Sequence, residues 1–139
     1  MTPIFVDTAG WATLAVRGER NHALAAELYE QCRQEGRHLV TTNYVLGELL
    51  SVFISPLRLP RHEQFQRIDM IRTSRIVDLV HVDAALDAAA WTFLKSRADK
   101  EWSLIDAVSF IVMQERGIPE ALTTDHHFEQ AGFVRLLKA

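Results

Sequence analysis

The chain has 139 residues, of which 48% are hydrophobic and 24% are charged, and its formal net charge is −3. This size and composition suit one ordinary globular domain, so residues 1–139 are expected to form a single domain without repeats or linkers. The negative charge gives no overall attraction to nucleic acid, so a polyanionic substrate would have to be met by a local basic patch or by bound cations.

Neither a targeting signal nor a membrane span is expected. Only the short apolar run from Ile4 to Val6 precedes the first acid, without a basic segment before it, and no stretch approaches the roughly 18 apolar residues of a span. The one cysteine, Cys32, excludes an internal disulfide and fits a reducing compartment as a small buried hydrophobic residue. We therefore expect a cytoplasmic protein.

Strand and helix patterns alternate along the chain. Short apolar runs bounded by polar residues predict strands at residues 4–6, 38–42, 76–80, 121–124 and 133–137. Helical patterns with caps and stops fall at about residues 9–16, 21–35, 43–53, 61–73, 83–98 and 103–116. This alternation indicates an α/β sandwich whose sheet is parallel, with right-handed crossovers.

The most apolar of these helices carries an acid near its start. Ser103 is a good N-cap, Gly117 ends the helix, and apolar residues surround the helix axis, which predicts a covered helix. Asp106 lies three residues after the cap. It fits a capping box with Ser103, and it equally fits a functional acid; the pattern alone leaves both readings open.

Three further acids occupy comparable positions. Asp7 follows the first strand and could also cap the next helix; Asp125 follows the fourth strand. Glu48 lies within the apolar run of the third helix, where it could also mark the wetter edge of that helix. In a parallel sheet the carboxyl ends of strands and the starts of the following helices share one edge, so all four acids should face one crevice.

Four carboxylates in one crevice would raise one another's pKa, and a divalent cation would relieve that repulsion. Oxygen donors favour Mg²⁺ or Mn²⁺, as one or two ions, over Zn²⁺. Such a site suits phosphodiester hydrolysis by an activated water, with no nucleophilic side chain.

These residues also carry a family resemblance. Asp7 in Phe-Val-Asp-Thr, Glu48 in Val-Leu-Gly-Glu-Leu-Leu, Asp106 in Trp-Ser-Leu-Ile-Asp-Ala, and Asp125 in Thr-Thr-Asp-His-His-Phe resemble the PIN domain in order and spacing over essentially the whole chain. More narrowly, the chain resembles VapC-type toxin ribonucleases and their stand-alone relatives.

The resemblance implies a PIN-like three-layer α/β/α sandwich with a central five-stranded parallel sheet. It implies that the enzyme is a Mg²⁺- or Mn²⁺-dependent endoribonuclease, with an RNA substrate, a cognate antitoxin protein and frequent homodimerisation. The implied catalytic and metal-binding acids are Asp7, Glu48, Asp106 and Asp125. Asp7 and Asp106 are expected as direct ligands, and Glu48 and Asp125 would complete the site directly or through water. Hydroxyls that would orient carboxylates or waters are those of Thr8, Ser103 and Thr124.

Other charged residues have weaker interpretations. Arginines cluster between residues 58 and 75, either as a solvated face or as an RNA or partner surface that includes Arg61, Arg67 and Arg72. Glu101 is interpreted as a loop residue, although it could be a fifth acid of the site. His126 and His127 are assigned to a surface turn that ends at Gly132.

The sequence gives less support to three rival functions. The Asp125-His126-His127 tripeptide matches the DHH phosphoesterases, but their further Asp and His motifs are missing from this sequence. A phosphatase of the haloacid dehalogenase type would need a second acid where Ala9 stands. A non-catalytic PIN-like module that binds RNA or protein usually lacks one of the acids, and all are present here, which favours the enzyme.

Overall fold

The computed structural model describes residues 1–138 and contains one five-stranded parallel sheet in the order β3-β2-β1-β4-β5. The strands are β1 (Ile4–Val6), β2 (Leu39–Thr42), β3 (Val77–Val80), β4 (Glu120–Leu122) and β5 (Val134–Arg135). The central strands β1 and β2 are buried along their whole length, as expected for apolar strands covered on both faces. The predicted parallel α/β architecture is confirmed.

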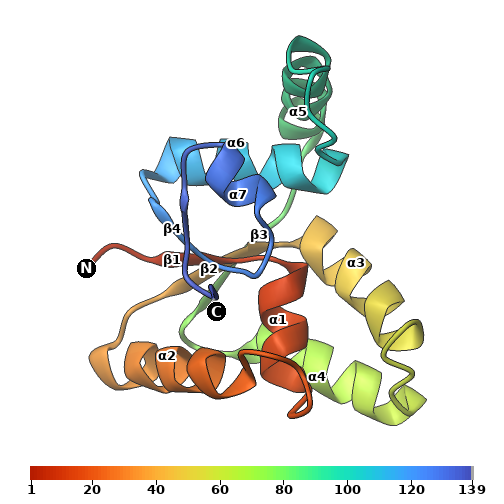
Figure 1. Ribbon diagram of the computed structural model, residues 1–139, viewed down its shortest axis with the longest axis vertical. Coiled ribbons are helices and arrows are strands. Elements are labelled where there is room, and N and C mark those ends of the chain that lie inside the picture. Colours follow the sequence, from red (N-terminus) through yellow and green to blue (C-terminus); the bar gives the residue numbers. More distant parts are fainter. Residues whose placement is uncertain (139) are drawn as a thin grey trace.

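Helices enclose the sheet. They are α1 (Thr8–Ala15), α2 (His22–Glu35), α3 (Asn43–Ile54), α4 (Arg61–Thr73), α5 (Ala84–Ser96), α6 (Leu104–Arg116) and α7 (His127–Gln130). Figure 1 shows α1, α2 and α4 on one side of the sheet and α6 and α7 on the other, with α5 packed on the outside of α6. The result is the expected three-layer α/β/α sandwich.

The register of the central strands decides which polar residues meet at the sheet edge. In the parallel pair of β1 and β4, Phe5 lies beside Ala121 and Val6 beside Leu122. The next residue of each strand, Asp7 and Thr123, therefore lies beyond the last pair at the carboxyl edge. This edge is also where α1 and α3 begin, directly after β1 and β2.

An aromatic cluster fixes the last part of the chain on the sheet. The ring of Phe128, in α7, packs edge-on against Phe110 of α6, with ring centroids 5.0 Å apart. It also packs against Phe5 of β1, at 6.3 Å. Phe128 is fully buried. Because α7 is anchored in this way, the loop between β4 and α7 has a defined position at the sheet edge.

Three predicted boundaries need correction. The second helix begins at His22, because Asn21 adopts a left-handed backbone with φ of 71°. The assigned part of the fifth strand is only Val134–Arg135, although the backbone N–H groups of Leu136 and Leu137 still donate to Ala121 and Thr123. His127, predicted to lie in a surface turn, begins α7.

Two further expectations concern burial. Cys32 is 4% exposed, which confirms it as a small buried hydrophobic residue. Among the helices of residues 1–138, none combines the length and the hydropathy needed to cross a membrane.

Candidate active site

Asp7 is both a helix cap and a buried acid at the sheet edge. Its Oδ1 accepts a hydrogen bond from the backbone N–H of Gly10 at 2.8 Å, which caps α1. Its Oδ2 accepts the hydroxyl proton of Thr123 at 2.6 Å. The cap uses one carboxylate oxygen, and the other oxygen accepts from Thr123 at the edge of the sheet.

Burial also gives Asp7 an unusual proton affinity. It raises the pKa of Asp7 from 3.8 to about 7, although hydrogen bonds from Thr123 and Gly10 lower it. The nearby carboxylates of Asp125 and Asp106 raise the pKa further. At neutral pH this carboxyl group is therefore only partly ionised, and a cation beside it would favour the ionised form.

Gly10 allows α1 to start this close to the sheet. A Cβ at position 10 would collide with the backbone carbonyl oxygen of Leu122 in β4. Glycine is therefore required for the helix to approach the strand that leads to Thr123, and the same residue donates to Asp7.

Asp106 shows the same combination of cap and acid. Its backbone N–H donates to the hydroxyl of Ser103, and its own Oδ2 accepts from the backbone N–H of Ser103, both at 3.0 Å. The predicted capping box is thus present. Burial raises the pKa of Asp106, and Asp125 raises it as well, against hydrogen bonding from Ser103 and the influence of His127.

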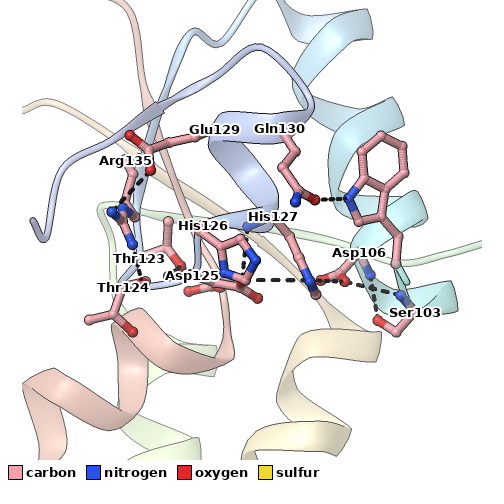
Figure 2. Close-up of polar contacts among 12 residues, drawn as sticks. Ser103, Asp106, Thr123, Thr124, Asp125, His126, His127, Glu129, Gln130 and Arg135 are labelled. Atoms are coloured by element: carbon pink, nitrogen blue, oxygen red, sulfur yellow. Dashed lines mark hydrogen bonds and ion pairs between the residues drawn. The ribbon is translucent and has the colours of Figure 1, made fainter. Parts of the chain in front are cut away.

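Thr123 and His127 connect the acids. The Thr123 hydroxyl, which donates to Asp7, accepts from the backbone N–H of Asp125 at 2.9 Å. Nδ1 of His127 lies 3.2 Å from Oδ2 of Asp106 and 3.5 Å from Oδ1 of Asp125, whose side chain also accepts from the His127 backbone N–H. Figure 2 shows Thr123, Asp125 and His127 on the segment after β4, with the His127 ring directed toward Asp106 at the start of α6.

A cleft of about 530 Å³ brings the predicted acids together. Its walls include Asp7, Thr8, Glu19, Arg20, Asn21, Glu48, Asp106, Thr124 and Asp125. All four predicted acids thus share one cavity, formed by segments that are far apart in the sequence. Whether each of them is a metal ligand stays a prediction.

The predicted hydroxyls have different surroundings. Thr8 is buried in the cleft wall, and its Oγ1 has no hydrogen-bond partner among the described residues. Thr124 also lines the cleft, while its backbone carbonyl accepts from Arg135 at 2.9 Å. Ser103, the N-cap of α6, affects the cleft through its hydrogen bonds with Asp106.

The predicted arginines lie on α4, outside the walls of the cleft. Arg61 donates to Gln64 at 2.9 Å, and Arg72 lies 3.7 Å from Asp69. Arg67 lines a different, mostly apolar cavity of about 270 Å³. Their proposed part in RNA or partner binding stays a prediction.

Several residues at the cleft or in contact with its acids were not predicted from the sequence. The strand register identifies Thr123, which follows β4 where Asp7 follows β1, whereas the sequence alone favours its neighbour Thr124. The contact of His127 with Asp106 was not predicted, because the sequence indicates only a surface turn at this position. Glu19 and Arg20 reach the cleft from the loop between α1 and α2, and no local pattern marks them.

The donor set fits a divalent cation. Carboxylate groups line the cleft, and the pKa values of two of them, Asp7 and Asp106, are raised. The Thr8 hydroxyl is buried there without a hydrogen-bond partner among the described residues. Ligand atoms of Asp125, His126 and His127 also lie within 4.8 Å of one another. Oxygen-rich sites suit Mg²⁺ or Mn²⁺, and a histidine nitrogen is more readily accepted by Mn²⁺.

Comparison with known proteins identifies the family of the chain. The family described as PIN domain matches residues 4–134, nearly the whole chain. The chain belongs to the PIN-domain family. The resemblance expected from the sequence is confirmed.

Relatives within the PIN family extend the comparison. The chain is 36% identical to the 23S rRNA-specific endonuclease VapC20 from two strains of Mycobacterium tuberculosis, over 133 residues that cover 96% of this chain and 97% of the relative. It also matches the crystal structure of Mycobacterium tuberculosis VapC20, described as a sarcin–ricin loop cleaving toxin. That match has a TM-score of 0.82 and 34% identity, and it covers 94% of this chain and 96% of the other. The five-stranded PIN fold is thereby confirmed.

Proposed function

We propose that this PIN domain is a divalent-metal-dependent endoribonuclease that hydrolyses phosphodiester bonds of RNA. The observation that carries the proposal is the convergence of Asp7, Glu48, Asp106 and Asp125 on one cleft. An isolated cap or a lone surface acid would not explain four carboxylates from four separate segments. A carboxylate cluster of this kind is typical of nucleases that bind Mg²⁺ or Mn²⁺.

The acids would hold one or two such ions, with Asp7 and Asp106 as direct ligands and Glu48 and Asp125 completing the site. When bound, such an ion lowers the pKa of a water, binds a phosphate oxygen and stabilises the leaving alkoxide.

Hydrogen bonds within the chain hold the carboxylates of Asp7 and Asp106 in defined orientations. Thr123 and the Gly10 N–H fix both oxygens of Asp7, so this carboxylate cannot rotate freely. The backbone N–H of Ser103 fixes one oxygen of Asp106, and His127 contacts the same oxygen. Carboxylates held in this way lose little conformational freedom when a cation or a phosphate binds.

The proposed biological role is that of a toxin in a type II toxin–antitoxin system, with a cognate antitoxin protein as partner. The relative VapC20 is named a 23S rRNA-specific endonuclease, and its structure is described as that of a sarcin–ricin loop cleaving toxin. We propose ribosomal RNA as the substrate class here too, which would place the activity in the cytoplasm. Homodimerisation stays a prediction from the family resemblance.

Cleavage of purified ribosomal RNA tests this proposal. The wild-type protein should cut the RNA with Mn²⁺ or Mg²⁺ and not with EDTA, while Asp106→Asn, purified in parallel, should leave it intact. Metal-dependent fragments from the wild type alone would support the nuclease. Cutting by both proteins would assign the fragments to a contaminant or another site, and no cutting by either would favour a module that only binds RNA or protein.

A further inference from the structure

The loop between α1 and α2 forms a wall of the acidic cleft through Glu19, Arg20 and Asn21. Its path is well defined. The backbone N–H of Glu19 donates to Val16 at 3.1 Å, and the left-handed conformation of Asn21 turns the chain into α2. These contacts fix the backbone from which the three side chains reach the cleft.

A second contact ties the end of this loop to α1. Nδ1 of His22 lies 2.8 Å from the backbone carbonyl oxygen of Thr13, which can only accept, so the ring donates. The backbone N–H of His22 also donates to Glu19 at 3.1 Å. Arg20 thus stands between two anchored residues.

The charge distribution of the cleft singles out Arg20. Five carboxylates line the cleft, those of Asp7, Glu19, Glu48, Asp106 and Asp125. Within the described residues, Arg20 is the only lysine or arginine in that lining. Without bound cations the five carboxylates would repel RNA phosphates, and the net charge of −3 gives no overall attraction to RNA.

The guanidinium of Arg20 is available for a ligand. The side chain is exposed, and none of the ion pairs found among residues 1–138 involves it. Arginine remains charged at all physiological pH values and presents forked N–H donors that match a phosphate group. The arginines of α4 lie outside this cleft, so they offer no equivalent contact there.

We propose that Arg20 binds a backbone phosphate of the RNA and so positions the strand beside the carboxylates. This inference rests on the proposed ribonuclease function and adds a residue for substrate binding to it. Arg20 lines the cleft without being one of the proposed metal ligands, so its contribution lies in RNA affinity and in the salt dependence of that affinity.

Arg17 provides a matched control. It belongs to the same loop region, is exposed and carries the same charge, but it does not line the cleft in the described chain. Arg17→Gln and Arg20→Gln therefore change the net charge equally and differ only in position. Arg20→Lys keeps the charge and removes the forked donors.

The first experiment measures cleavage of a fluorescein-labelled RNA hairpin with the sarcin–ricin loop sequence at several KCl concentrations. Arg20→Gln should raise KM about tenfold with kcat within about twofold of the wild type. The slope of log(kcat/KM) against log[KCl] is negative, and its magnitude should decrease by about 0.7 to 1, the effect of one lost phosphate contact. Arg17→Gln should match the wild type, and Arg20→Lys should restore the salt slope but only part of the affinity.

Binding without cleavage gives an independent measurement. In the Asp106→Asn background, fluorescence anisotropy should show the same loss of affinity for Arg20→Gln, with an unchanged unfolding midpoint. Equal effects of Arg17→Gln and Arg20→Gln, or a fall in kcat with unchanged KM, would overturn the assignment of Arg20. If the wild type cuts no RNA, the ribonuclease proposal fails, which is a different result from cutting that ignores Arg20.

Discussion

Replacing Asp7 by asparagine should stabilise the metal-free protein at neutral and alkaline pH. Burial raises the pKa of Asp7 from 3.8 to about 7 in the folded state. Between these values the folded protein keeps a proton that the unfolded chain releases. The free energy of unfolding should therefore decrease as the pH rises from about 4 to about 7, and the loss is complete above about pH 7.

The size of the effect follows from the same pKa. Its rise from 3.8 to about 7 corresponds to about 4 kcal/mol of destabilisation once Asp7 is ionised. Asparagine is neutral and its oxygen can still accept from the Gly10 N–H, but the acceptor for Thr123 is lost, at a cost of about 1 kcal/mol. We expect a net gain of about 1–3 kcal/mol above pH 7 and little or no gain near pH 4.

Urea unfolding in EDTA at pH 5, 6, 7 and 8 measures this directly. The stability difference between Asp7→Asn and the wild type should grow with pH, while Glu101→Gln, which removes an exposed acid outside the cleft, should show no such trend. An Asp7→Asn variant that is less stable than the wild type by the same amount at every pH would refute the argument, because Asp7 would then act only as a helix cap.

Three further outcomes are expected. Asp7→Asn should abolish metal-dependent RNA cleavage, measured on gels with the folded variant. Thr123→Val should raise the pKa of Asp7 further, because it removes a hydrogen bond that lowers this pKa. It should also reduce kcat at least about tenfold, since Asp7 and Asp125 lose their common hydrogen-bond partner. Thr124→Val, measured alongside, should reduce kcat less. Gly10→Ala should lower the free energy of unfolding by about 1–3 kcal/mol in urea titrations, because α1 must move away from β4, and unchanged stability would contradict that packing.

The convergence of the four acids on one cleft could be predicted from the sequence because their positions follow from topology. Alternating strands and helices bring the residues after β1 and β4 to one edge, together with the starts of α3 and α6. Asp7 and Asp106 show that a capping role does not keep an acid out of the cleft: Asp7 caps α1, Asp106 completes the capping box of α6, and both line the cleft.

The residues that connect and complete the site could not be predicted so readily. Choosing between Thr123 and Thr124 requires the register of β1 against β4 to within one residue, which the apolar runs do not define. His127 reaches Asp106 only because Phe128 anchors α7 in the aromatic cluster. Arg20 lies in the loop between α1 and α2, and a loop has no hydrophobic periodicity from which its position at the cleft could be predicted.

Titration of the protein with Mn²⁺ by isothermal calorimetry tests the central claim most directly, namely that the four converging acids form a cation site. The wild type and Glu101→Gln should bind Mn²⁺ with the same affinity, whereas Asp7→Asn and Asp106→Asn should bind it much more weakly or not at all. Undiminished binding by both Asp variants, or no binding by the wild type, would contradict the claim.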